Sequence, residues 1–265
     1  MIKKTFFFLA MLSLFSCQPE EKKEQPADAP AKKDAPLFYH YSIWYAFVNK
    51  VFEGDLTVKE LKRNGDIGLG SYNFLDGELI MLDGVPYQVT EDGVVSVPAD
   101  TTKIVYANAS FFKEDHSFSL QSVSGYDTLR SRLNEQLPTK NYFYAFKIHA
   151  QFTNLKCGGL QEQQRPFKEG LDVLIPARPV FERDTVAGTM VGFYCPEFIG
   201  EINVAGYHLH FISDDKKYGG HVMEFAEGKH LNVSLSKITR YQFNLPETAD
   251  YENVSLDKTF QYNKK

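Results

Sequence analysis

Three of the seven histidines of the chain lie close together, in the segment "GYHLHFISDDKKYGGH" at residues 206–221. His208 and His210 are two residues apart, and this spacing places both imidazoles on one face of a β-strand. Leu209 and Phe211 then occupy the opposite face and give it an apolar character. The pattern is typical of a strand that is half-buried, with its polar face available for chemistry.

The third imidazole, His221, follows a polar, glycine-rich turn. If residues 214–217 form the loop, Ser213 pairs with Tyr218 and His210 lies directly opposite His221. Opposed residues of an antiparallel pair share a face, with their Cβ atoms about 4.5–5.5 Å apart. Three neutral imidazoles suit zinc and leave a fourth position open for water or substrate. The alternative is that these histidines are ordinary hydrogen-bonded strand residues.

Glu78 is the second candidate for chemistry. In "LDGELIML" it shares one face of the expected strand with Ile80 and Leu82. A carboxylate among aliphatic side chains is costly unless it has a partner, and zinc or its bound water would be one. The alternative is a glutamate exposed at the edge of a sheet.

The sequence lacks the motifs of several other kinds of catalytic or binding site. The chain has no C-x-x-C motif for a thiolate zinc site, no G-x-S-x-G nucleophile turn and no glycine-rich loop that opens a helix. Its net charge is −5 and its basic residues are not clustered, which argues against nucleic acid as a partner. Cys157 and Cys195 would pair in an oxidising compartment or remain as two free thiols.

The elements that must position these residues are mostly strands, because aromatic and β-branched residues recur in short segments between Gly, Asp and Asn. Helices are expected in only three places. Thr57 and Glu60 form a capping-box pattern in "TVKELKRNG", and "YDTLRSRLNEQL" has leucines at four-residue intervals. "YSIWYAFVNKVF" fits either a helix or a strand. The expected strands are 71–82, 85–90, 93–98, 103–112, 141–156, 188–196, 206–213 and 221–227.

The N-terminal segment has the features of a processing signal. Lys3 and Lys4 precede an apolar run that is too short to span a bilayer, and the run ends in "LFSC". This ending predicts a bacterial lipoprotein signal at residues 1–16, with Cys17 lipidated; ordinary cleavage nearby is the alternative. Residues 17–36 are rich in Pro, Glu, Lys and Ala and predict a solvated tether. We therefore expect a lipid-anchored protein of the bacterial cell envelope, on its periplasmic side or at the cell surface.

A weak internal similarity links two segments. "GSYNFLDGELIMLDG" and "GFYCPEFIGEINVAG" both run from Gly through aromatic residues to a glutamate, Glu78 or Glu201, and close on Gly. This similarity suggests a duplicated sheet-forming unit.

Nearly the whole body of the chain, residues 37–265, resembles the α-acetolactate decarboxylase family. The most specific shared blocks are "LDGE" and the histidine segment "GYHLHFISDDKKYGGH". The resemblance implies an α+β fold of two similar sheet-rich halves packed together, with a zinc site in the cleft between them. It also implies assembly into homodimers, which are common in the family.

The resemblance also assigns roles to individual residues. His208, His210 and His221 match the zinc ligands of the family. Glu78 matches its active-site glutamate close to the metal. Ser71 lies where the family motif usually has threonine, in the wall that binds substrate.

The reaction implied is the loss of CO2 from 2-acetolactate, a 2-hydroxy-3-keto acid, to give acetoin. An open zinc suits this chemistry, because it polarises the ketone and stabilises the enolate left by the departing carboxylate. Glu78 would take part in delivering the proton to carbon.

The chain departs from the family pattern in two places. Gly158 lies where the family has an arginine, and no glutamate follows Glu252 in the C-terminal segment, where the family has one that reaches the site. Arg165 is the candidate replacement for the missing cation. Two alternatives to the decarboxylase follow: a catalytically impaired or repurposed family member that binds zinc or a small ligand, and a metal-assisted hydrolase of an envelope substrate.

Overall fold

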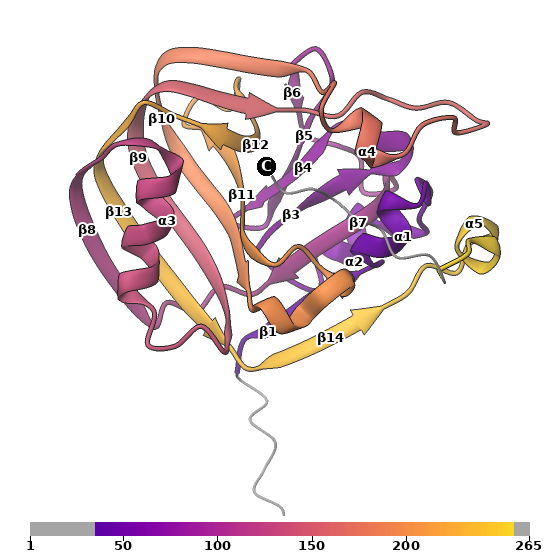
Figure 1. Cartoon of the computed structure of the whole chain (residues 1–265), viewed down its shortest axis with the longest axis horizontal. Coiled ribbons are helices and arrows are strands. Elements are labelled where there is room, and N and C mark those ends of the chain that lie inside the picture. The colour runs from indigo at the N-terminus through magenta and orange to yellow at the C-terminus, as the bar shows by residue number, and fades with distance from the viewer. Residues whose placement is uncertain (1–34, 257–265) are drawn as a thin grey trace, which may run out of the picture. The chain divides into compact units, whose positions relative to one another are not determined.

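Two β-sheets and five helices make up most of residues 35–256, the part of the chain that this computed structural model describes (Figure 1). The expected signal segment, Cys17 and most of the expected tether fall outside these residues. The first strand begins at Leu37. Within residues 35–256, no helix is both long enough and apolar enough to cross a membrane.

The first sheet has eight strands in the order β14-β1-β7-β3-β4-β5-β6, with β2 paired to β7. Strands β1 and β14 pair in parallel, and the other pairs are antiparallel. The strands are β1 (Leu37–Tyr41), β2 (Leu56–Thr57), β3 (Ile67–Tyr72), β4 (Glu78–Leu82), β5 (Val85–Val89), β6 (Val95–Ser96), β7 (Lys103–Ser110) and β14 (Arg240–Asn244).

The second sheet has six antiparallel strands in the order β10-β11-β12-β9-β13-β8. Because β9 pairs with β10 as well as with β12, strands β9 to β12 close into a ring. The strands are β8 (His116–Val123), β9 (Phe143–Gly158), β10 (Val180–Cys195), β11 (Gly206–Ser213), β12 (Gly219–Glu224) and β13 (Glu227–Ile238).

The helices are short apart from one. They are α1 (Trp44–Val48), α2 (Val58–Leu61), α3 (Gly125–Gln136), α4 (Leu171–Leu174) and α5 (Ala249–Asn253), with 3-10 turns η1 (Asn73–Leu75) and η2 (Glu197–Ile202). The expected helix in "YDTLRSRLNEQL" is confirmed as α3, and the ambiguous segment "YSIWYAFVNKVF" contains α1. The capping box of Thr57 and Glu60 is also present, but α2 behind it is a single turn.

The two sheets pack against each other through alternating side chains. On β11, Leu209 and Phe211 point to an outer core that includes Leu129 and Leu133 of α3. Ile212 points the other way and packs on β4 of the first sheet, within a cluster between the two sheets. Figure 1 shows α3 on the side of the second sheet that faces away from β3 and β4. The even-numbered residues of β11 therefore face the first sheet, and the two histidines are among them.

One expected strand, residues 71–82, is wrong. The chain breaks it into β3, the turn η1 and β4, because Phe74, Leu75 and Gly77 take positive φ values of 62°, 60° and 93°. Phe74 and Leu75 give no sequence signal for this conformation, which glycine adopts far more readily. The break places Glu78 at the first position of β4 instead of in mid-strand.

Cys157 and Cys195 are both free and buried. Of the two alternatives for these cysteines, the structure therefore has the free thiols.

Candidate metal centre and active-site cavity

The histidine hairpin has the expected register. His210 pairs with His221 across β11 and β12, and the backbone N–H of Ser213 donates to the carbonyl oxygen of Tyr218 at 2.8 Å, closing the turn. Gly220, directly before His221, has φ 132°, and a Cβ there would lie 2.7 Å from the carbonyl oxygen of Gly158. The second glycine of "GGH" is therefore required for the hairpin to pass β9 so closely.

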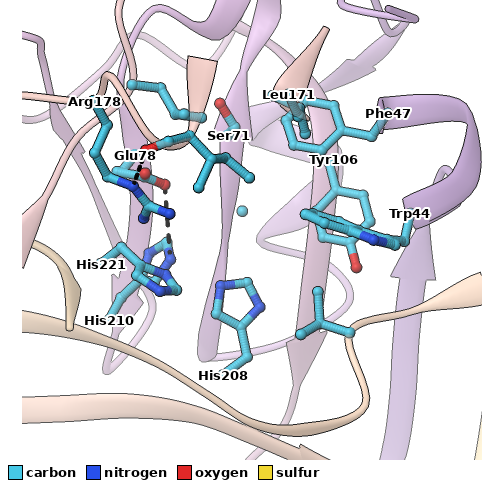
Figure 2. Close-up of a pocket in the computed structure, with 14 residues that line it drawn as sticks. Trp44, Phe47, Ser71, Glu78, Tyr106, Leu171, Arg178, His208, His210 and His221 are labelled. Atoms are coloured by element: carbon cyan, nitrogen blue, oxygen red, sulfur yellow. Dashed lines mark hydrogen bonds and ion pairs between the residues drawn. The ribbon is translucent and has the colours of Figure 1, made fainter. Parts of the chain in front are cut away.

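The three imidazoles converge on one point. The ring centroids of His208, His210 and His221 are 5.0–5.3 Å apart, and one nitrogen from each ring lies within 4.8 Å of the other two. Figure 2 shows the rings turned toward a common space. The prediction that this hairpin alone brings three imidazoles together is confirmed.

The hydrogen bonds of the histidines suit metal binding. The Nδ1 atom of His210 lies 2.9 Å from the carbonyl oxygen of Leu79, which can only accept, so Nδ1 carries the proton and Nε2 has the free lone pair. Within residues 35–256, Nε2 of His210 and Nδ1 of His208 are buried without a hydrogen-bond partner. A buried nitrogen without a partner costs free energy, and a cation would satisfy the lone pair on Nε2 of His210. The backbone acceptor on the far nitrogen is the usual support of a histidine ligand.

Burial keeps these imidazoles neutral. Desolvation lowers the pKa of His208 to about 4, with a smaller contribution from the charge of Arg178. The pKa values of His210 and His221 are well below the ordinary value, chiefly through desolvation and then through neighbouring histidines. Only the neutral ring binds a metal, so the site is ready for one at neutral pH.

Glu78 faces the imidazoles from the opposite sheet. Its side chain is buried, and Oε2 lies 3.7 Å from Nε2 of His210. Burial raises the pKa of Glu78 to about 8, with Arg178 acting weakly in the opposite direction. The alternative of a glutamate exposed at a sheet edge is therefore wrong. This buried carboxyl lies beside the imidazole of His210, at a distance too long for a hydrogen bond.

Ser71 lies beside Glu78, to which it is paired across β3 and β4. Its side chain is buried, and Oγ donates to the carbonyl oxygen of Gly77 at 3.1 Å. Ser71 and Glu78 line the same cavity, and the hydroxyl of Ser71 stabilises the tight turn that precedes Glu78.

A cavity of about 170 Å³ separates the imidazoles from an apolar wall. For comparison, a cavity of about 150 Å³ is large enough for benzene. The space therefore suits a small molecule, somewhat larger than benzene. Its lining residues are Trp44, Phe47, Gly70, Ser71, Glu78, Tyr106, Leu160, Leu171, Ile175, Arg178, Val204, His208, His210 and His221.

The apolar wall is built from α1, β7 and the long connection between β9 and β10, residues 159–179. Phe47 stacks on Tyr106 at a centroid distance of 5.4 Å, and Trp44 meets the edge of Tyr106 at 6.3 Å. The hydroxyl of Tyr106 donates to Oδ1 of Asn203 at 2.6 Å, which fixes the ring. In Figure 2 these rings lie across the cavity from the histidines. Sequence reasoning missed this wall, because its residues look like ordinary core aromatics.

Arg178 is the other lining residue that sequence reasoning missed. It follows α4, and its Nε donates to the carbonyl oxygen of Ile175 at 3.0 Å. Its guanidinium enters the cavity next to Glu78 (Figure 2). No spacing in the sequence connects this arginine to the histidines or to Glu78.

Comparisons with known proteins identify the family of the chain. A sequence model described as alpha-acetolactate decarboxylase matches residues 38–258. The alpha-acetolactate decarboxylase of Brevibacillus brevis is 34% identical over 94% of this chain and 87% of its own length. That of Methanosarcina mazei is 33% identical over 85% of this chain and 77% of its own length. This chain belongs to the alpha-acetolactate decarboxylase family.

Solved structures extend the likeness from sequence to fold. The crystal structure of the alpha-acetolactate decarboxylase of Bacillus subtilis strain 168 matches with a TM-score of 0.80 and 31% identity, over 84% of this chain and 94% of that one. A Staphylococcus aureus protein described as similar to the family matches with a TM-score of 0.78 and 27% identity. The expected sheet-rich α+β fold is therefore confirmed, and this family member is an enzyme of the carboxy-lyase class.

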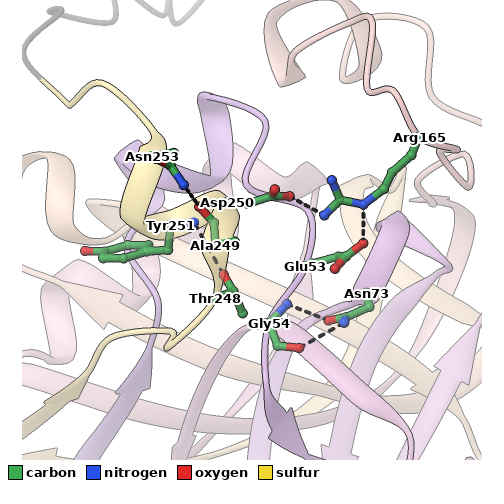
Figure 3. Close-up of polar contacts among 9 residues, drawn as sticks. All are labelled: Glu53, Gly54, Asn73, Arg165, Thr248, Ala249, Asp250, Tyr251 and Asn253. Carbon is green, nitrogen blue, oxygen red and sulfur yellow. Dashed lines mark hydrogen bonds and ion pairs between the residues drawn. The ribbon is translucent and has the colours of Figure 1, made fainter.

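The structure does not bring Arg165 into the cavity of this family member. Its Nε donates to Glu53 and its Nη2 to Asp250, each at 2.6 Å, and the guanidinium lies over the ring of Phe167 (Figure 3). These contacts tie the β9–β10 connection to the segment before β2 and to α5. The prediction that Arg165 replaces the family arginine is therefore wrong. Arg165 instead anchors a loop at the surface.

Proposed function

We propose that this protein decarboxylates 2-acetolactate to acetoin, with zinc held by His208, His210 and His221. The observation that carries the proposal is the convergence of three neutral imidazoles, one buried and two partly buried, and one buried carboxyl on a single small cavity, in a chain of this family. The donor set fits zinc because it consists of three neutral nitrogens, and the far nitrogen of His210 donates to a backbone carbonyl oxygen. When bound, zinc would supply Lewis-acid polarisation of the substrate ketone and stabilisation of the enolate charge.

Glu78 is the residue that we assign to proton transfer. In the protein without metal its pKa is raised to about 8 by burial, so its carboxyl holds a proton at neutral pH. A carboxyl at the cavity wall, with Oε2 3.7 Å from Nε2 of His210, is placed to deliver a proton to the carbon from which CO2 departs. The balance is simple: the C–C bond to the carboxylate breaks, its electron pair becomes the enolate, and one proton from Glu78 completes acetoin.

The two walls of the cavity divide the substrate between them. The oxygen-bearing carbons belong beside the imidazoles, Glu78 and Ser71, and the methyl groups belong against Trp44 and Leu171. The apolar wall also excludes water from the enolate, so that the proton comes from a positioned carboxyl.

The test is direct. Purified mature protein, loaded with zinc, is given 2-acetolactate, and acetoin is measured with and without prior treatment by a chelator. We expect acetoin from the zinc-loaded protein, its loss on chelation, and its return on adding zinc. A zinc-loaded protein that makes no acetoin above the spontaneous rate would contradict the proposal.

We also propose that the chain is lipidated at Cys17 and held in the bacterial cell envelope. The support is the sequence "LFSC" after an apolar run and the polar composition of residues 17–36. A Cys17→Ala variant should leave the membrane fraction for the soluble fraction of the envelope. An unchanged distribution would exclude the lipid anchor.

Two further proposals concern the architecture. Duplication of a sheet-forming unit is supported by the two similar segments, because each runs from a strand into a 3-10 turn. The likeness ends at the glutamates, since Glu78 is buried in β4 whereas Glu201 is exposed in η2. A homodimer is proposed from the family resemblance alone, and sedimentation of the mature protein tests it.

A further inference from the structure

Arg178 places a permanent positive charge inside the cavity. Among the described residues that line the space it is the only arginine, and no lysine lines it. Within residues 35–256 it makes no ion pair, and Nε is occupied only by the carbonyl oxygen of Ile175. The remaining N–H groups are therefore available to a ligand, and a guanidinium matches a carboxylate with two parallel hydrogen bonds.

The side chain of Arg178 passes directly over Gly158 on its way into the cavity. A Cβ at Gly158 would lie 2.6 Å from Cδ and 3.2 Å from Nη1 of Arg178, and 3.0 Å from Sδ of Met223. Gly158 is the last residue of β9, pairs with His221, and does not have a positive φ. The backbone conformation at this position therefore does not require glycine. A side chain there is opposed first by Cδ of Arg178 and then by Sδ of Met223.

We propose that Arg178 binds the carboxylate of the substrate and that Gly158 is the residue that admits it. This inference rests on the proposed function. The two positions are coupled: a side chain at 158 and the side chain of Arg178 cannot occupy the same space beside His221. The cation that the family resemblance places at position 158 thus enters the same part of the cavity from the β9–β10 connection.

The carboxylate loses its charge as CO2 forms, whereas the enolate charge develops on the oxygen atoms near the imidazoles. A guanidinium on the carboxylate therefore stabilises the bound substrate more than the transition state. Removing it should raise KM and leave kcat unchanged or somewhat higher. A residue with a merely structural role would not produce this division.

The experiment compares two small ligands of equal shape on the zinc-loaded mature protein. 2-Hydroxy-2-methylpropanoate carries the carboxylate, and its amide is the neutral counterpart; neither can be decarboxylated as a β-keto acid. Calorimetry on the wild type should show tighter binding of the carboxylate. Arg178→Gln should reduce the affinity for the carboxylate by about 10- to 100-fold and leave that for the amide unchanged.

Three further variants sharpen the result. Arg183→Gln removes an exposed arginine of β10 and should change neither affinity. Gly158→Ala should lower the carboxylate affinity through the contact with Cδ of Arg178. Combining Gly158→Arg with Arg178→Gly should restore part of the preference for the carboxylate. Zinc content and thermal unfolding are measured for every variant, so that a folding defect is recognised.

The outcomes separate this inference from the proposed function. If the protein makes no acetoin but Arg178→Gln abolishes the carboxylate preference, the inference stands and the proposed reaction fails. A wild type that does not prefer the carboxylate would overturn the inference. So would a folded, zinc-bound Arg178→Gln variant that keeps the preference.

Discussion

The two walls of the cavity are built in different ways. The polar wall comes from regular strands: His208 and His210 from β11, His221 from β12 and Glu78 from β4. Much of the opposite wall, and Arg178 with it, comes from α1 and the β9–β10 connection, where the chain follows no repeat. Strand pairing fixes the backbone positions of the polar wall, so that only the side-chain rotamers remain to be set. The position of the opposite wall depends on loop packing. The proposed metal chemistry thus depends on the strand-built wall, and the proposed selection of the substrate depends largely on the loop-built wall.

The largest expected effect is the removal of a strand-borne ligand. His210→Ala removes one metal ligand and leaves the carbonyl oxygen of Leu79 without its donor. We expect loss of bound zinc and a fall in kcat/KM of roughly 10³-fold or more, because a metal supplies several kcal/mol of charge stabilisation. Metal analysis and the acetoin assay check this. The control is His149→Ala. His149 is exposed and paired with Asp214, so this variant should keep both zinc and activity.

Glu78→Gln should separate chemistry from metal binding within the same wall. The amide keeps the shape of the side chain but cannot donate an acidic proton, so kcat should fall by about 10²-fold or more. Zinc content should stay at the wild-type level, since Glu78 lies outside the set of three imidazoles. A variant that loses zinc in parallel with activity would make Glu78 a ligand and contradict its role in proton transfer.

The burial of Glu78 should also appear as a pH dependence of stability in chelator-treated protein. The folded pKa of about 8 lies above the ordinary value of 4.5, so between these values the folded state binds more protons than the unfolded state. Stability due to this group therefore falls as pH rises. Relative to Glu78→Gln, the wild type should lose about 2–3 kcal/mol of unfolding free energy between about pH 5.5 and about pH 8.5.

Urea unfolding at several pH values measures this difference. The exposed Glu169→Gln variant serves as the control and should follow the wild type at every pH. A constant gap between Glu78→Gln and the wild type would mean that the carboxyl is not kept protonated by burial.

The smallest expected effect concerns the anchoring of the loop-built wall. Arg165→Gln removes two ion pairs, to Glu53 and Asp250, at a position where the arginine is half exposed. Exposed pairs of this kind contribute at most about 1 kcal/mol each. We expect a modest fall in thermal stability and a change in KM of a few-fold, with kcat nearly unchanged. A loss of activity as large as that of Arg178→Gln would mean that Arg165 acts in the substrate site.

The same contrast explains how much the sequence alone could predict. The H-x-H spacing and the length of the turn were enough to predict the register of His210 with His221, because the period of a strand and the pairing of a hairpin are local rules. Helix α3 followed from its leucine spacing. The turn at Phe74 and Leu75 could not be predicted, since nothing in these side chains favours positive φ.

Arg178 could not be predicted for a different reason. Its place depends on where residues 159–179 fold back, which is set by contacts remote in sequence: Arg165 with Glu53 and Asp250, and the backbone N–H of Gln163 with the carbonyl oxygen of Phe74. The one local trace of Arg178 is the glycine at position 158. In the sequence alone, this glycine indicates only the absence of the family arginine.

The central claim is that one hairpin holds a divalent ion through three imidazoles and leaves a position open. X-ray absorption at the zinc edge of the zinc-loaded mature protein tests it most directly. We predict the scattering of three imidazole rings, with the remaining ligand a light atom that changes when 2-hydroxy-2-methylpropanoate is added. A first shell with sulfur, or with fewer than three imidazoles, would contradict the account.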